Sequence, residues 1–209
     1  MSAQSPRQAG IARWDARFAG DEYVFGTAPN AFLASQAHRL RPGMTALAVA
    51  DGEGRNGVWL AEQGLDVLSI DASAEGLAKA GKLADARGVH IGIELADLAD
   101  WDWGTARFDV IAAIFIQFAD PALRKSIFEG MQRALKPGGL LLLQGYRPEQ
   151  VGHGTGGPPT VENLYTADML RAAFAGMDLL QLDEHDSVIS EGTGHHGLSA
   201  LIDLVARKR

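Results

Sequence analysis

The sequence predicts an α/β fold in which a mainly parallel sheet carries helices on both faces. From residue 45 onward, short apolar runs alternate with helix-forming segments, a pattern typical of strands joined by crossover helices. One run, residues 108–115, is apolar at nearly every position, as expected of a central parallel strand that is buried on both faces. The chain has 209 residues, a length that fits one large domain.

The remaining elements follow from apolar runs and helix signals. We expect further strands at residues 45–50, 66–70, 89–95 and 140–143, followed by two strand-like runs at 179–189 and 198–206. We expect helices at residues 56–63, 73–87, 121–135 and 166–175. Ser73 and Gly88 are suited to cap the second of these helices, and Asp120-Pro121 has the N-cap and N1 signature of the third.

The two ends of this pattern differ from its middle. Residues 1–10 are predicted to be a disordered tail, and residues 11–209 a single domain that opens with an aromatic, helix-prone segment, residues 11–41. The stretch from 147 to 165 is long for a connection without regular structure, which is typical of a lid or a binding loop.

Composition narrows the classes of partner. The chain has no cysteine, which excludes disulfides and thiolate chemistry and makes a cytoplasmic location the expectation. Its net charge of −7 argues against a nucleic-acid partner, because such proteins usually present a basic face. The longest apolar run, residues 140–143, is far too short to span a bilayer, so no membrane partner is expected. His195 and His196 lack metal-ligand spacing, and no metal site is expected.

A glycine-rich turn follows the first strand and opens the next helix. Its glycines allow close approach of a ligand to the backbone, and the helix start offers unpaired N–H groups. The candidate binding residues of this turn are Asp51, Gly52, Glu53, Gly54, Arg55 and Asn56. The alternative is a tight turn that binds nothing, because this glycine pattern also arises by chance.

Carboxylates end the next two strands. Asp71, beside Ala72, lies 19 residues beyond Gly52, where a carboxylate can accept both ribose hydroxyls of an adenosine cofactor. Asp97 and Leu98 close the third strand and are candidates for binding the adenine amine. Each aspartate has an alternative role, as a helix cap or as an ordinary surface residue.

The fourth strand supplies the last candidates at this edge. Ligands of open α/β sheets lie at the carboxyl ends of strands, which makes Ile114 and Gln117 candidates for contact with a cofactor. Core packing is the simpler role for Phe115 and Phe118. The glycine pattern with Asp71 fits a dinucleotide as well as other adenosine cofactors, so these residues alone leave hydride transfer and methyl transfer open.

Motifs along nearly the whole chain, about residues 12–207, resemble one family. They are residues 14–18, 25–26, 52–56, 59–64, 67–73, 108–110, 135–139 and 154–159. Together they are similar to class I S-adenosylmethionine-dependent methyltransferases, and within these to the tellurite-resistance and thiopurine-methyltransferase-like branch. The chain departs from the family at Ala48 and Ala50, where an acidic residue and a glycine are usual. We hypothesise that Asp51 partly substitutes for the missing acid.

The resemblance implies a three-layer, Rossmann-like fold with a seven-stranded, mostly parallel sheet. Its strand order would be 3-2-1-4-5-7-6 with strand 7 antiparallel, and the two C-terminal strand-like runs would form that hairpin. It also implies that S-adenosylmethionine is the cofactor and that the N-terminal aromatic segment covers it, which would place Trp14, Arg17 and Tyr23 near the methionine end. The activity implied is methyl transfer to a small-molecule acceptor, thiol-like or metalloid-like or another small nucleophile.

Such a transfer needs alignment above all, because a sulfonium methyl is already activated. A hydroxyl or amine acceptor would also need a general base, for which Tyr146 and His153 are the candidates and His195 and His196 more distant ones. Residues 152–159 are predicted to form a lid over the acceptor pocket. Two other functions stay open, a nicotinamide-dependent oxidoreductase and a non-catalytic binder of an adenosine cofactor. Both a monomer and a homodimer fit the sequence.

Overall fold

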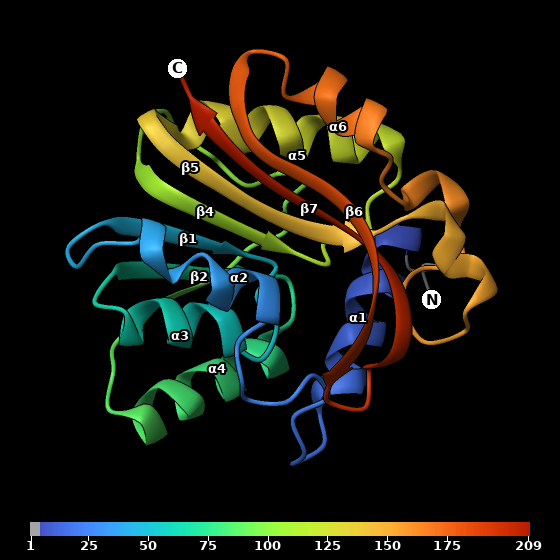
Figure 1. Cartoon of the computed structure of the whole chain (residues 1–209). Coiled ribbons are helices and arrows are strands. Elements are labelled where there is room, and N and C mark those ends of the chain that lie inside the picture. The colour runs from blue at the N-terminus through green and yellow to red at the C-terminus, as the bar shows by residue number, and fades with distance from the viewer. Residues whose placement is uncertain (1–4) are drawn as a thin grey trace.

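A computed structural model describes residues 5–209 and contains one seven-stranded sheet (Figure 1). The strands are β1 (Thr45–Val49), β2 (Asp66–Asp71), β3 (Gly92–Leu95), β4 (Phe108–Ile114), β5 (Leu135–Tyr146), β6 (Met177–Glu191) and β7 (His195–Lys208). Their order is β3-β2-β1-β4-β5-β7-β6, with β7 antiparallel to both of its neighbours. The predicted strand order and the closing hairpin are therefore confirmed.

Helices cover both faces of the sheet. α5 (Pro121–Ala134) and α6 (Ala167–Ala173) lie on one face, and α2 (Ala31–Ser35), α3 (Arg55–Glu62) and α4 (Ala74–Arg87) lie on the other (Figure 1). Short 3-10 turns occupy Ala37–Arg39, Pro148–Gly152 and Val161–Asn163.

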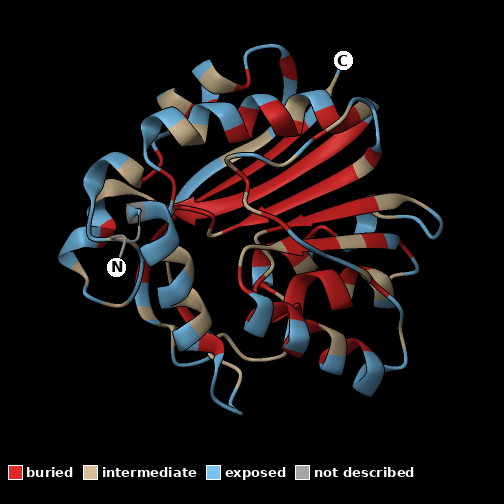
Figure 2. Cartoon of the chain, turned by 180° about the vertical axis from the view of Figure 1, so that it is seen from behind, coloured by how far each residue is buried: buried red, intermediate tan, exposed pale blue. Residues whose placement is uncertain are grey.

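Each face of the sheet has its own core, because side chains alternate along a strand. In β5, Leu141 and Leu143 join the core under α5 and α6, whereas Leu142 joins the core under α3 and α4. Figure 2 shows the buried residues gathered on the central strands and on the sheet-facing sides of the helices. Burial on both faces explains why these strands are almost continuously apolar.

The predicted helix caps are present. The Ser73 hydroxyl accepts a hydrogen bond from the Gly76 N–H, and Gly88 ends α4 in the left-handed conformation with φ 66°. The Asp120 carboxylate accepts from the Leu123 N–H, with Pro121 in the first turn of α5. Local capping signals therefore locate these two helices.

The predicted disordered tail is wrong for residues 6–10, which belong to α1 (Pro6–Phe18). Ser5 and Gln8 form a capping box, in which each side chain accepts a hydrogen bond from the other residue's backbone N–H, and Pro6 occupies the first turn. These contacts satisfy backbone donors at the start of the helix and stabilise it. Residues 1–4 of the predicted tail lie outside the described residues.

The β6–β7 hairpin runs past the sheet and reaches the N-terminal segment beside α1 (Figure 1). At its tip, the Gly194 N–H donates to the Val24 carbonyl at 3.1 Å, and the Thr193 hydroxyl donates to the same oxygen at 3.3 Å. Residues distant in sequence thereby enclose one end of the sheet. Within residues 5–209, no helix combines the length and apolarity needed to cross a membrane.

Candidate functional site

A cavity of about 720 Å³ lies at the carboxyl ends of β1, β2, β3 and β4, under α1. Ten of the predicted binding residues line it: Trp14, Asp51, Gly52, Arg55, Asn56, Asp71, Ala72, Asp97, Leu98 and Ile114. Its volume lies in the range of small-molecule sites. The structure thus brings most of the predicted cofactor residues to one place.

The glycine turn has a backbone that favours glycine. Gly52 and Gly54 have φ values of 57° and 86°, in the left-handed region. A Cβ on Gly54 would lie 2.5 Å from the Cβ of Ala80, so the absence of a side chain lets the start of α3 pack against α4. Ala50 has φ 48°, a left-handed conformation that is strained for a residue with a side chain.

Asp51 holds the turn against its neighbours. Its carboxylate accepts hydrogen bonds from the Gly57 N–H, at 3.1 and 3.2 Å, and from the Ser69 hydroxyl at 2.8 Å. A Cβ on Gly57 would lie 2.4 Å from Asp51 Oδ2 and 3.4 Å from the Cβ of Ala48, so the Asp51 carboxylate lies near the side chain of residue 48. Desolvation raises the Asp51 pKa to about 7, against the opposing effect of these hydrogen bonds.

Asp71 is anchored to the same turn. One carboxylate oxygen accepts from the Gly52 N–H at 2.8 Å and the other from the Ser73 N–H at 2.8 Å. Burial raises its pKa, and these backbone N–H groups oppose the shift. The side chain is held at the edge of the cavity, where it keeps lone pairs for a ligand hydroxyl.

Asp97 joins the third strand's end to α1. Its carboxylate accepts from the Ala99 N–H at 3.1 Å and pairs with Arg7, which also pairs with Asp100. Arg7 lines the cavity as well. It falls in the segment predicted to be disordered, so sequence reasoning missed it.

The opposite end of the cavity is aromatic. Phe25, Phe115 and His195 line it, and the His195 ring lies 4.5 Å from that of Phe25 and 4.4 Å from that of Phe115, centroid to centroid. Phe115 has φ 55°, an unusual backbone conformation for a bulky residue that the surrounding packing must hold. Tyr146 stacks behind Phe115 at 4.7 Å.

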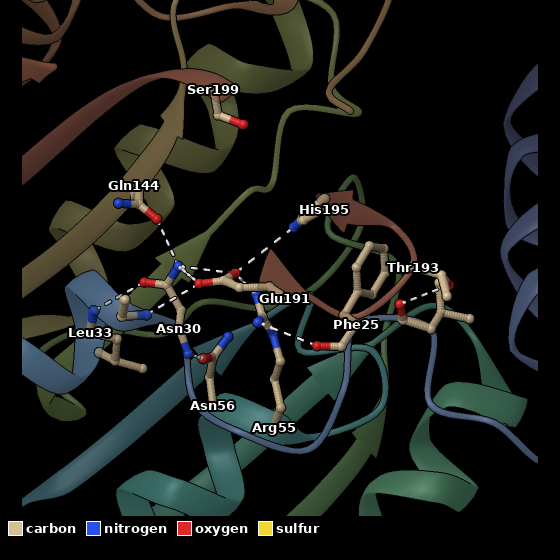
Figure 3. Close-up of polar contacts among 12 residues, drawn as sticks. Phe25, Asn30, Leu33, Arg55, Asn56, Gln144, Glu191, Thr193, His195 and Ser199 are labelled. Carbon is tan, nitrogen blue, oxygen red and sulfur yellow. Dashed lines mark hydrogen bonds and ion pairs between the residues drawn. The ribbon is translucent and has the colours of Figure 1, made fainter. Parts of the chain in front are cut away.

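A buried polar network supports this end (Figure 3). Arg55 pairs with Glu191 at 2.7 Å, and the Asn30 amide donates to Glu191 at 3.0 Å and to Gln144 at 2.7 Å. The network joins the N-terminal segment, α3, β5 and the β6–β7 hairpin. Its members are far apart in the sequence, which contains no local signal of their contact.

Five predicted cofactor residues lie outside the cavity lining, and four of them make contacts with the N-terminal segment or α4. Tyr23 donates its hydroxyl to the Lys79 carbonyl at 3.0 Å, and the Glu53 carboxylate forms a buried ion pair with Lys79 at 2.6 Å. Gly54 packs against α4, as described above. Arg17 covers the rings of Trp14 and Phe25, 5.2 and 5.1 Å from their centroids.

Gln117 also turns away from the cavity. Its amide donates to the Tyr146 carbonyl at 2.9 Å and accepts from the Tyr146 N–H at 2.6 Å, so it continues the pairing of β4 with β5. The prediction that it faces a ligand overlooked these backbone groups, which need partners once the strand ends are buried.

The two predicted catalytic residues do not border the cavity. Tyr146 is buried with its hydroxyl enclosed, and burial raises its pKa. His153 is half-buried and follows the 3-10 turn Pro148–Gly152. The catalytic roles of Tyr146 and His153 stay predictions. Of the histidines that the structure describes, only His195 lines the cavity.

Part of the sequence is also similar to known proteins. Residues 46–139 match a family model described as a methyltransferase domain. An uncharacterized methyltransferase of Synechocystis sp. is 31% identical over 105 residues, which are 50% of this chain and 48% of that protein. The chain thus matches about half the length of this relative.

Solved structures share the fold over most of the chain. A structure from a study of the conversion of a disulfide bond into a thioacetal group during echinomycin biosynthesis has a TM-score of 0.76 at 23% identity, covering 95% of this chain and 91% of that one. TehB from Haemophilus influenzae has a TM-score of 0.72 at 19% identity, covering 88% of this chain and 64% of TehB. Residues 46–139 are therefore similar in sequence to a methyltransferase domain, and the described chain shares the fold of these solved structures.

Proposed function

We propose that this chain transfers the methyl group of S-adenosylmethionine to a small-molecule acceptor. The observation that carries the proposal is the single cavity that joins anchored carboxylates at one end to an aromatic wall at the other. One end suits a nucleoside and the other a reacting group. The methyltransferase match of residues 46–139 supports the same assignment.

The residues at the carboxylate end fit the nucleoside of this cofactor. Asp71 would accept hydrogen bonds from the ribose hydroxyls, because its carboxylate is fixed at the strand end by Gly52 and Ser73. Asp97 and Leu98 border the adjoining space, where they would meet the adenine. These contacts leave the reacting end of the cofactor directed to the rest of the cavity.

The turn fits the methionine part. Asp51 is the acid of the turn that lines the cavity, and its carboxylate would attract an ammonium group. The N–H groups at the start of α3 provide positive potential for a carboxylate. When bound, the cofactor supplies a methyl group on a sulfonium; the protein's part is to hold the acceptor in line and to exclude water.

The finer assignment is also a proposal. The sequence motifs and the structural likeness to TehB support the tellurite-resistance and thiopurine-methyltransferase-like branch, and with it a thiol-like, metalloid-like or other small nucleophile as acceptor. The net charge of −7 and the lack of cysteine support action in the cytoplasm without nucleic-acid or membrane partners. Both a monomer and a homodimer are compatible with this function.

Calorimetry with S-adenosylmethionine, S-adenosylhomocysteine and NAD tests the proposal. We expect both sulfur compounds to bind and NAD not to bind. Asp71→Asn should weaken binding about 10- to 100-fold, because hydrogen bonds to a charged group are each worth about 1.5–3 kcal/mol. Asp85→Asn, on the exposed side of α4, is the matched control and should bind as the wild type does.

The outcomes separate the competing functions. Binding of NAD in preference to S-adenosylmethionine would replace the proposal with a nicotinamide-dependent oxidoreductase. Binding of S-adenosylmethionine without methylation of any thiol, phenol, selenite or tellurite would leave a non-catalytic binder.

A further inference from the structure

The segment between α1 and α2 carries part of the cavity wall, although residues 19–30 contain no helix or strand. Within it Phe25 lines the cavity, as does Phe18 at the end of α1. The Phe18 ring lies against the glycine turn, since a Cβ on Gly52 would be 3.2 Å from it. The position of this wall therefore depends on the contacts that hold the segment in place.

The Lys79 side chain of α4 holds the segment by its backbone. Its ammonium donates hydrogen bonds to the carbonyl oxygens of Phe18, Gly20 and Glu22, at 3.3, 2.8 and 2.6 Å. A lysine has three N–H donors, so these three carbonyls use all of them. Phe18 is the last residue of α1, where carbonyls lack partners within the helix and a positive charge is favourable.

Glu53 completes the arrangement from the glycine turn. Its carboxylate lies 2.6 Å from the Lys79 ammonium and also accepts a hydrogen bond from the Phe25 N–H at 3.3 Å. The Glu53 and Lys79 side chains are 2% and 8% exposed, so each buried charge needs the other. The Tyr23 hydroxyl adds a further bond, to the Lys79 carbonyl at 3.0 Å. Both the turn and α4 are thus attached to residues 18–25.

We propose that Glu53 and Lys79 form a clasp that positions the N-terminal segment for cofactor binding and slows release of the cofactor. This inference rests on the proposed function. Neither side chain lines the cavity, so the clasp acts through Phe18 and Phe25, which do. When only part of a protein population is competent to bind, the apparent Kd rises in inverse proportion to that fraction. Loss of the clasp therefore weakens binding without removing a group that touches the cofactor.

A purely structural role is the alternative, because loss of one buried charge also destabilises the fold. Lys79→Met leaves Glu53 buried and unpaired, whereas Glu53→Gln/Lys79→Met removes both charges. In urea unfolding, the double variant should regain about half or more of the stability that Lys79→Met loses. It still lacks the donors for the three carbonyls, so stability and the position of the segment become separable.

Stopped-flow displacement of S-adenosylhomocysteine, followed by tryptophan fluorescence, measures release, because Trp14 lines the cavity. We expect Glu53→Gln/Lys79→Met to raise both the release rate and Kd at least about tenfold. Glu75→Gln/Lys82→Met makes the same two chemical changes on the exposed side of α4. This control should behave as the wild type does.

Two further measurements keep the test independent of the double variant's stability and of the cofactor. Tyr23→Phe removes only the hydroxyl bonded to the Lys79 carbonyl and should raise the release rate about two- to tenfold. Without cofactor, the Phe25 and Gly26 amides should exchange hydrogen faster in the double variant than in the wild type, while those of α5 keep their rates.

The outcomes separate the clasp from the proposed function. A release rate that returns to the wild-type value along with stability in the double variant would show a structural role alone and overturn the inference. Unchanged release in both the double variant and Tyr23→Phe, or unchanged exchange at Phe25, would overturn it as well. If the wild type does not bind S-adenosylhomocysteine, the proposed function fails, while the exchange measurement still decides whether the clasp holds the segment.

Discussion

Asp51→Asn should remove a pH dependence of folding that the glycine turn creates. The pKa of Asp51 rises from 3.8 to about 7 in the folded chain, so the folded state keeps this proton to a higher pH than the unfolded state does. Folding stability from this group is therefore complete below about pH 4 and is lost as the pH rises to about 7. At 1.36 kcal/mol per pKa unit, the loss amounts to about 4 kcal/mol at most.

Urea unfolding between pH 5 and pH 8 measures this effect. Asparagine has nearly the same shape and can still accept a hydrogen bond from Gly57 or Ser69, but it has no proton to lose. We expect the free energy of unfolding of the wild type to fall relative to that of Asp51→Asn across this range, by about 1–4 kcal/mol. Groups that do not interact with Asp51, such as His195, affect both proteins equally and cancel in the difference.

The control is Asp85→Asn, which should follow the wild type at every pH because Asp85 is exposed. Parallel curves for the wild type and Asp51→Asn would refute the reasoning. That result would mean that the carboxylate is already ionised in the folded turn. Asp51 would then substitute for the missing acid at residue 48 as an ionised carboxylate.

Three further predictions concern the same region. Ala50→Gly should raise the free energy of unfolding by about 0.5–1 kcal/mol in urea, because glycine relieves the strain of φ 48°; a decrease would contradict this. Lys79→Met should lower it by about 3–5 kcal/mol, because Glu53 is left buried without its partner, and a loss below about 1 kcal/mol would show the pair to be dispensable. Amide hydrogen exchange in residues 152–159 should slow when S-adenosylmethionine is added, and equal rates with and without it would rule out the predicted lid.

Local signals in the sequence account for much of the fold. The caps at Ser73 and Asp120 locate two helices, and the continuously apolar runs locate the central strands. The strand order did not follow from such signals; it came from resemblance to a family, because pairing between distant strands has no local signature. The start of α1 was missed although the capping box of Ser5 and Gln8 and the proline between them are readable in the sequence.

The carboxylate half of the candidate site was predictable from the position of its residues at the ends of strands. Asp51, Asp71 and Asp97 each end or follow a strand, and parallel strands bring their ends to one edge. The aromatic half was not predictable from the sequence. His195 lies in the site only because the hairpin tip contacts the N-terminal segment, which is distant in sequence.

Because of that long-range contact, the cavity is enclosed late in the folding of the chain. During synthesis Val24 emerges long before Gly194, the residue with which its carbonyl pairs. The N-terminal segment can therefore close over the cavity only after the β6–β7 hairpin has been made. Contacts of such sequence separation form slowly, because a long loop must close first.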